Sequence, residues 1–370
     1  MNSFKSFFSI SFLSSISHYI FQLLAARFLG EDQFITFSGL WANINLLMFF
    51  GTFGQYWFAI GNNKKSQFFY LFKIGYAFSI LSFLFYFIIH KVTFLILGYF
   101  FISVAHAFLA GKLLSQVDFK CLSLINFLPA LLKIMLLCII PKGYLNSSSI
   151  ILILSASFLL THIIYSFIHE SEELNKREFK NTSPILASLI LSLSNHFFPI
   201  SDLLWANFFR APHILNIMAP VSLLTRAVFF FQLIIAQWWL PRFIKKKWNQ
   251  TPLIIVLILI GVITGSYFTS LIFEFFLNDF LNWKELPSKT SFFLGCLNAV
   301  FMALNFQVLQ LTLLNNLVKK AAGLLLLVLI IWSLLGFISA RAEIYFFIMA
   351  MTNATTFIIG IGIKKRILSD

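Results

Sequence analysis

Two long apolar stretches between residues 183 and 241 carry charged and polar side chains that apolar stretches normally lack. The first contains Asn195, His196 and Asp202, and the second contains Arg226. An ionised side chain at the centre of a bilayer costs about 2.5–3.5 kcal/mol on insertion scales. Such residues usually face a partner or a water-filled cavity, so these four predict a polar path through a membrane.

Arg226 is the strongest candidate for binding an anionic group. It lies about 13 residues into its apolar stretch, which is roughly 20 Å at 1.5 Å per helical residue. An arginine can bind a phosphate with two hydrogen bonds at once. The same guanidinium could instead neutralise Asp202, and Asp202 could bind a proton or Na⁺, so these roles stay open.

Further basic side chains lie in or beside other apolar stretches. Lys133 is near the middle of its stretch, whereas Lys73 is close enough to one end for its ammonium group to reach the membrane surface. Arg27 lies near a stretch end and is typical of an interfacial anchor. His18 and His196 could relay protons, although a lone buried histidine more often serves packing through a hydrogen bond.

Two of the stretches carry their polar residues on one helix face. The first stripe consists of Ser11, Ser15, His18 and Gln22, and the second consists of Ser188, Ser192, Asn195, Pro199 and Asp202. Residues at such spacings share a face of an α-helix. These side chains also hydrogen-bond between packed membrane helices, so the stripes fit a cavity lining or a helix contact. Pro199 removes one main-chain hydrogen bond and predicts a kink.

The composition predicts the elements that position these residues. Of 370 residues, 59% are hydrophobic and only 11% are charged, whereas about a quarter are charged in a soluble domain. Stretches long enough to cross a bilayer occupy residues 6–29, 35–60, 67–90, 92–114, 121–140, 147–168, 184–209, 213–241, 252–277, 290–316, 321–338 and 343–363. We therefore expect an all-α integral membrane protein with about 12 transmembrane helices.

The loops divide these helices into two sets and orient them. The polar segment 169–183 is the predicted linker between an N-terminal lobe of six helices at 1–168 and a C-terminal lobe of six helices at 184–370. Lobes with the same orientation would form a parallel repeat. Basic runs at 245–247 and 364–366 fall on one side, so both termini are expected in the cytoplasm. This placement explains most of the net charge of +14 without a nucleic-acid partner.

The chain resembles a transporter family in three places. Its first predicted hairpin reads Leu-Ala-Ala-Arg-Phe-Leu-Gly-Glu-Asp-Gln-Phe at 24–34, its seventh span holds Ile-Ser-Asp at 200–202, and its eighth ends in Leu-Pro-Arg at 240–242. These patterns are similar to those of the O-antigen-type polysaccharide flippases. That family belongs to the multidrug/oligosaccharidyl-lipid/polysaccharide exporter (MOP) superfamily.

The resemblance implies two six-helix lobes around a V-shaped central cavity that opens alternately to each side of the bacterial cytoplasmic (inner) membrane. The implied cargo is an undecaprenyl-pyrophosphate-linked oligosaccharide, which would move from the inner to the outer leaflet for assembly of lipopolysaccharide O-antigen or capsule. The implied partners are this lipid-linked oligosaccharide, the lipid bilayer and other polysaccharide-assembly proteins.

Two other functions remain open. An ion-coupled multidrug or metabolite antiporter of the same superfamily would be expected to hold more acid in its cavity than Asp202 alone. A polytopic enzyme of glycan assembly would need a long outer loop or a close histidine–acid pair, and neither is evident. With no Walker loop, dinucleotide fingerprint or metal-ligand spacing, we expect no enzymatic activity, no cofactor and no metal site. Transport would then be passive or driven by membrane potential or an ion gradient, with H⁺ and Na⁺ both open.

Overall fold

The computed structural model describes most of the chain as helices. The described residues are 2–60, 65–115, 119–168, 184–209, 214–229, 263, 265–267, 270–283, 287–314, 317–338 and 341–368, and none of them forms a β-strand. The chain divides into two compact units, Met1–His196 and Phe197–Asp370. Each unit has its own helices and core, and we describe each by itself.

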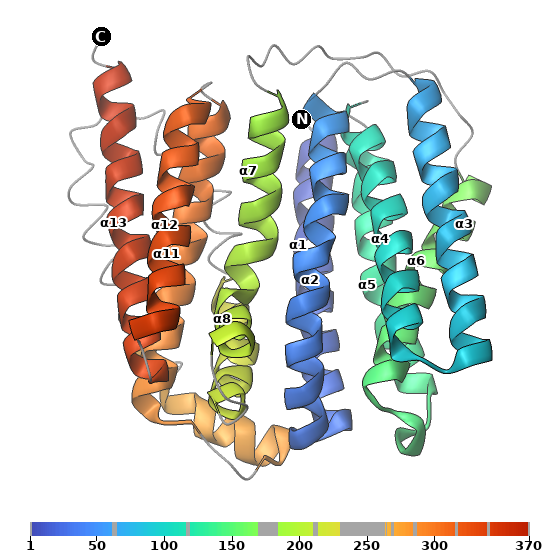
Figure 1. Ribbon diagram of the computed structural model, residues 1–370, viewed down its shortest axis with the longest axis horizontal. Coiled ribbons are helices and arrows are strands. Elements are labelled where there is room, and N and C mark those ends of the chain that lie inside the picture. The colour runs from blue at the N-terminus through green and yellow to red at the C-terminus, as the bar shows by residue number, and fades with distance from the viewer. Residues whose placement is uncertain are drawn as a thin grey trace. The chain divides into compact units, whose positions relative to one another are not determined.

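The N-terminal unit contains seven helices in the part that is described (Figure 1). They are α1 (Asn2–Leu29), α2 (Glu31–Ile60), α3 (Lys65–Ile89), α4 (Val92–Ser115), α5 (Phe119–Ile139), α6 (Ser147–Ile168) and α7 (Pro184–Phe197), the last of which ends at the unit boundary. Helix α4 packs against α2, α3 and α6, whereas α5 packs against α1 and α6. Helix α4 therefore holds the centre of this unit.

The hairpin between α1 and α2 shows how local chemistry sets the helix ends. Gly30 adopts a positive φ of 73°, which an L side chain rarely takes, and its N–H donates to the carbonyl of Ala26 at 3.2 Å. Glu31 and Asp32 fill the first turn of α2 and Arg27 lies in the last turn of α1, so each charge complements its helix dipole. The sequence motif at 24–34 therefore forms the turn that connects α1 to α2.

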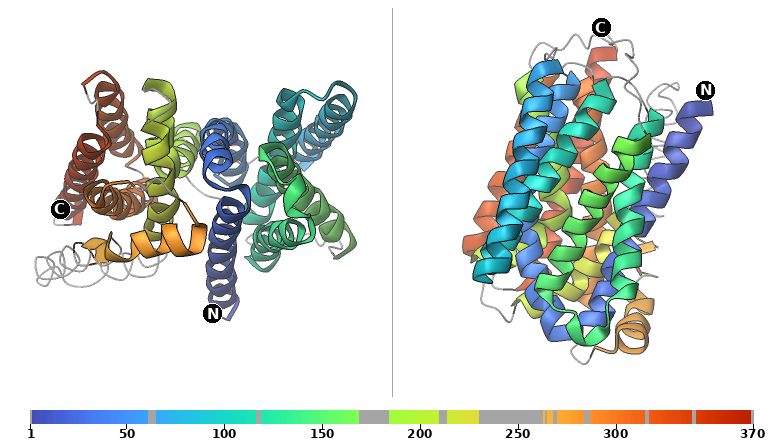
Figure 2. Two further views of the ribbon diagram at one scale, coloured as in Figure 1. Left: turned by 90° about the horizontal axis from the view of Figure 1, so that it is seen from below. Right: turned by 90° about the vertical axis from the view of Figure 1, so that its right-hand side faces the viewer.

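The C-terminal unit is built on a pair of long, closely packed helices. It contains the 3₁₀ turn η2 (Phe198–Ile200), α8 (Ser201–Phe209), an unlabelled helix (Ile214–Phe229), the π-helical turn η4 (Phe276–Leu281), α11 (Lys289–Leu314), α12 (Val318–Ile338) and α13 (Ala342–Leu368). Helices α11 and α13 run alongside each other (Figure 2). The amide group of Asn353 in α13 bridges Asn298 and Asn305 of α11, with both hydrogen bonds at 3.1 Å.

Most of the predicted spans are confirmed as helices. The ranges 6–29, 35–60, 67–90, 92–114, 121–140, 147–168, 290–316, 321–338 and 343–363 each coincide with one helix to within a few residues. The seventh span is interrupted where the kink at Pro199 is predicted, because it consists of α7, η2 and α8. The range 213–241 is helical to Phe229, and its remainder, most of 252–277 and the linker 169–183 lie outside the described residues.

Helix length and surface character establish a membrane protein. Among the described residues, 6 helices are long and apolar enough to cross a bilayer: Glu31–Tyr56, Val92–Leu113, Ser147–Ser166, Lys289–Gln310, Val318–Gly336 and Ala342–Gly362. Large apolar side chains are also exposed, as on α3, where Ile88 is 74% exposed. Water would disfavour so much apolar surface, whereas hydrocarbon does not. The expected all-α membrane fold is confirmed; the count of twelve spans, the lobe boundaries and the V-shaped cavity stay predictions.

Gly111 tests the close approach of α2 and α4. A Cβ at this position would lie 2.6 Å from the carbonyl oxygen of Gln55 and 2.9 Å from its Cα, both of which are main-chain atoms that cannot easily move. We expect Gly111→Ala to lower the free energy of unfolding by about 1–3 kcal/mol, through overpacking. Gly323→Ala is the matched control, because a Cβ there meets nothing within 4 Å. Thermal unfolding in detergent measures both, and equal stability of the two variants would contradict the close packing.

Candidate functional site

Lys133 is a buried cation in the N-terminal unit. It lies in α5, its side chain is 5% exposed, and its Nζ forms a hydrogen bond with Nδ1 of His18 in α1. The ammonium group also lies over the ring of Phe21, 4.8 Å from the centroid. An imidazolium ring has no acceptor nitrogen, so Lys133 and His18 share this bond only while one of the two is neutral. The pair therefore holds at most one positive charge.

Two further histidines continue this polar region. Nδ1 of His106 in α4 lies 3.2 Å from Nε2 of His162 in α6, and both side chains are buried. Their rings stack with centroids 5.3 Å apart. His18 and His106 interact electrostatically, which connects the two pairs. We call His18, His106, Lys133 and His162 the basic cluster; they come from α1, α4, α5 and α6.

Asn126 fixes the basic cluster in the helix packing. Its main-chain carbonyl accepts a hydrogen bond of 2.9 Å from Oγ of Ser14, and its side chain hydrogen-bonds His106. This one residue of α5 therefore contacts both α1 and α4. Ser14 lies one helical turn before His18, so the α1–α5 contact is polar over two successive turns.

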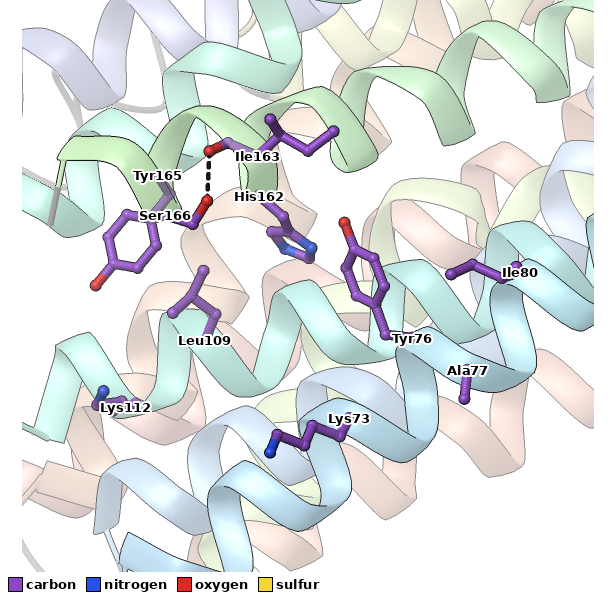
Figure 3. Close-up of a pocket in the computed structure, with 10 residues that line it drawn as sticks. All are labelled: Lys73, Tyr76, Ala77, Ile80, Leu109, Lys112, His162, Ile163, Tyr165 and Ser166. Atoms are coloured by element: carbon purple, nitrogen blue, oxygen red, sulfur yellow. Dashed lines mark hydrogen bonds between the residues drawn. The ribbon is translucent and has the colours of Figure 1, made fainter.

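A cavity of about 580 Å³ meets the basic cluster at His162 (Figure 3). It is lined by residues of α3, α4 and α6, namely Lys73, Tyr76, Ala77, Ile80, Leu109, Lys112, His162, Ile163, Tyr165 and Ser166. The side chains of Tyr76 and His162 face each other, with ring centroids 5.5 Å apart. The predicted site residue Lys73 thus shares a cavity with one member of the basic cluster.

The described interior of the N-terminal unit holds basic groups but no acidic ones. Within the described residues of this unit, the acidic side chains are Glu31 and Asp32, which lie at the start of α2. Asp32 is exposed and Glu31 is partly exposed. A buried cation is normally paired with an anion or hydrogen-bonded. Lys133 has the acceptor His18 and the face of Phe21 instead, so its surroundings suit an anionic ligand.

The second polar stripe makes helix contacts at its α7 end. The ring of His196 forms a hydrogen bond with the hydroxyl of Thr52 in α2, and Oγ of Ser192 donates to the carbonyl of Phe49 at 2.6 Å. Asn195 is exposed on the same helix. His196 belongs to the N-terminal unit and Arg226 to the C-terminal unit, so the polar path that these residues predict stays a prediction.

Asp202 and Arg226 lie together in the C-terminal unit, at the break between α7 and α8. Both are buried, at 4% and 5% exposure, and their charges attract each other. Oδ1 of Asp202 accepts a hydrogen bond of 2.8 Å from the N–H of Leu203, in the first turn of α8. Nε of Arg226 donates to the carbonyl of Pro199 at 3.3 Å. The carboxylate therefore lies at the start of α8, as the helix dipole favours, and the guanidinium binds the 3₁₀ turn that precedes it.

The remaining predicted residues lie in α1. Arg27 is exposed in its last turn, and Gln22 is half-buried one turn beyond His18. Both have polar or electrostatic partners within the structure. Of the nine predicted site residues, the structure brings His18 together with Lys133 and Asp202 together with Arg226. Lys73 lines the same cavity as His162, a member of the basic cluster.

The sequence interpretation missed His106, His162, Tyr76 and Lys112. The first two lie well inside the predicted spans 92–114 and 147–168, so their position in apolar stretches was a usable signal. Among the described residues, no three histidine, cysteine, aspartate or glutamate side chains converge as a metal site would require.

The comparisons with known proteins concern structure. No protein-family model matches the chain, and no curated protein is significantly similar to it. The chain is similar to a crystal structure of MATE in complex with MaD5, at 11% identity, with 96% of each chain covered and a TM-score of 0.45. It is also similar to a MOP superfamily transporter from Pyrococcus furiosus, at 12% identity, with 97% of this chain and 98% of that chain covered and the same TM-score of 0.45. These comparisons do not assign the chain to a family, so the resemblance seen in the sequence motifs stays a prediction.

A double-mutant cycle tests the charge pair at the helix break. We expect Arg226→Met and Asp202→Asn each to lower the free energy of unfolding by about 3–5 kcal/mol, because each leaves a buried charge without its partner. The double variant should be more stable than the sum of the two losses predicts, by about 1–3 kcal/mol.

The exposed pair of Lys289 and Glu274 provides the matched control. Their charged atoms lie 3.3 Å apart, but the side chains are 64% and 44% exposed. Because water screens such a pair, the same cycle with Lys289→Met and Glu274→Gln should give a coupling of about 1 kcal/mol or less. Additive losses at Asp202 and Arg226, measured by unfolding in detergent, would show that the two charges act independently.

Proposed function

We propose that this protein is a membrane transporter that moves a lipid-linked, pyrophosphate-bearing oligosaccharide across the bilayer. The observation that carries the proposal is the basic cluster, a buried region of positive and titratable groups without an acidic side chain in the described interior of its unit. A pyrophosphate would supply the negative charge that this region lacks. Cationic drugs would be disfavoured there for the same reason.

The resemblance of the sequence motifs to those of polysaccharide flippases suggests which cargo is carried. It favours an undecaprenyl-pyrophosphate-linked oligosaccharide, carried from the inner to the outer leaflet of the cytoplasmic membrane for polysaccharide assembly. In this proposal the lipid tail stays in hydrocarbon, while the charged group passes basic side chains such as Lys133. Because Lys133 is held by His18 rather than by a carboxylate, an anion does not have to displace a competing anion.

The broken helix at Pro199 would support alternating access. In this proposal the break is a joint inside a predicted span, beside the buried charges of Asp202 and Arg226, at which two helix segments would change their angle. Discontinuous helices of this kind occur in transporters, with charged groups at the half-helix ends. In this proposal the contacts of Arg226 and Asp202 stabilise one of the angles between the two helix segments.

A proton-coupled drug or metabolite antiporter is the second candidate. The hydrogen bond between His106 and His162 favours it, since paired histidines can exchange protons. The two candidates differ in cargo and in the sign of the charge that the basic cluster would meet. They therefore make different predictions for the lipid-linked glycans of the cell.

Depletion of the protein separates the two functions. For the flippase, we expect a complete oligosaccharide repeat to accumulate on its polyprenyl carrier while surface polysaccharide disappears. Mass spectrometry of extracted polyprenyl-linked glycans measures the first effect and staining of surface polysaccharide the second. An unchanged lipid-linked pool, together with increased drug sensitivity, would reject the flippase and support the antiporter.

Complementation of the depleted strain tests the basic cluster directly. Lys133→Gln should reduce surface polysaccharide at least tenfold, because the loss of one phosphate contact by a cation costs about 1.5–3 kcal/mol. Lys142→Gln is the matched control: Lys142 also lies over an aromatic ring, that of Phe28 at 5.2 Å, but it is exposed. Membrane levels of both variants are compared by immunoblot. Full complementation by Lys133→Gln would remove Lys133 from the cargo path.

A further inference from the structure

The cavity between α3, α4 and α6 has a charged end and an apolar end. Lys112 and Ser166 lie near the ends of α4 and α6, and Lys73 lies in the first half of α3, which packs against α4. Ala77 and Ile80 follow along α3, away from these side chains. Figure 3 shows the two lysines on one side of the cavity and Ile80 on the other. The lining therefore changes from basic to apolar along the helix direction.

This gradient matches the depth profile of a membrane leaflet. Lys73 lies about eight residues from the start of α3, which is roughly 12 Å at 1.5 Å per residue. A lysine at that depth can extend its ammonium group to the level of the lipid head groups. Its side chain is exposed, as this requires. The distribution of basic residues predicts that this end of the helices faces the cytoplasm, where anionic lipids concentrate.

The apolar end of the cavity is continuous with an exposed apolar surface. Ile80 and Ile163, on opposite walls, are each 48% exposed. Beyond them on α3, Leu81 is 47% exposed and Leu84 is 54% exposed. A hydrocarbon chain entering between the two isoleucines would thus continue along apolar side chains rather than meet polar ones.

We propose that this groove binds an anionic phospholipid of the leaflet in which α3 begins. The phosphate would lie between Lys73 and Lys112, and one acyl chain would lie along Ala77, Ile80 and Ile163. A volume of about 580 Å³ is in the usual range for ligand sites. Basic pockets between membrane helices are known to hold anionic head groups. The inference does not depend on which cargo the protein moves.

A charge-removal experiment tests the head-group contact. The purified full-length protein is titrated in neutral detergent with phosphatidylglycerol and with phosphatidylcholine, and bound lipid is counted by native mass spectrometry. Wild type should prefer phosphatidylglycerol. Lys73→Gln with Lys112→Gln should bind it roughly 30-fold more weakly, since each basic residue near a membrane surface contributes about 1 kcal/mol. Lys319→Gln with Lys320→Gln is the matched control, because it removes the same charge from exposed positions at the start of α12.

A shape change tests the acyl-chain contact. Ala77→Phe fills the apolar end of the groove and leaves both lysines in place, so it should also weaken phosphatidylglycerol binding at least tenfold. Ala322→Phe, beside the control lysines in α12, should have no such effect. Elution as a single species and an unchanged unfolding temperature show that each variant is folded. Glycerol 3-phosphate is added in competition to distinguish a lipid from a soluble phosphate.

Four outcomes would overturn the proposal. Equal binding of the two lipids, or wild-type affinity in the double lysine variant, would show that Lys73 and Lys112 do not recognise the head group. Wild-type affinity in Ala77→Phe would show that no acyl chain enters the groove. Complete displacement of the lipid by millimolar glycerol 3-phosphate would assign the site to a soluble phosphate. Since none of these measurements involves transport, a failure here leaves the proposed flippase function standing, and the reverse also holds.

Discussion

A positive charge inside a membrane-spanning helix bundle must be balanced, and the N-terminal unit is organised around that constraint. Lys133 is buried, and its hydrogen-bond partner is a histidine that has to be neutral while the lysine is charged. The aromatic face of Phe21 adds a favourable but weak contact. These groups come from α1 and α5, so the packing of those two helices depends on how the charge is held. A cation balanced only by neutral groups remains able to attract an anion.

The C-terminal unit meets the same constraint in a different way. Its buried arginine, Arg226, lies near a buried aspartate, and each of the two side chains also hydrogen-bonds the main chain of a broken helix. The pair is therefore largely self-compensated, and its charges stabilise a backbone feature that Pro199 creates. The sequence interpretation left open whether Arg226 binds cargo or neutralises Asp202, and we propose neutralisation because the two buried side chains attract each other. The two units differ in this respect: one holds an internally balanced pair, and the other holds a basic cluster without an acidic partner among its described residues.

The helices could be predicted from the sequence because hydrocarbon imposes a simple rule. A span must satisfy its main-chain hydrogen bonds internally, so each long apolar stretch becomes a helix of similar length. The break at Pro199 could be predicted because proline lacks the N–H that a continuous helix needs. Neutralisation of Arg226 by Asp202 was one of the roles that the sequence left open, because both charges lie in adjacent apolar stretches, and it stays a prediction. These inferences use local properties of the chain, which a single sequence displays.

The basic cluster could not be assembled in that way. His18 and Lys133 are 115 residues apart in the chain, and His106 and His162 are 56 apart. A polar stripe marks the face of α1 that carries His18, but the helices that carry Lys133, His106 and His162 are apolar on most sides. The sequence therefore does not show which face of one helix meets which face of another. Small side chains decide such contacts in membranes, as Gly111 does where α4 approaches Gln55 of α2. Each histidine could be recognised as unusual by its position, but its partner depends on this three-dimensional packing.

His162 belongs to the basic cluster and also lines the cavity that holds Lys73 and Lys112. A change of charge in the cavity therefore acts on the basic cluster through this one side chain. An anion in the cavity favours a positive charge on His162, and His106 then has to act as the neutral acceptor in their shared hydrogen bond. His106 in turn interacts electrostatically with His18, the partner of Lys133. By thermodynamic linkage, any ligand that favours a protonated cluster is itself bound more tightly when the cluster is protonated. An anion at the groove and a proton in the cluster should therefore favour each other's binding, without a carboxylate between them.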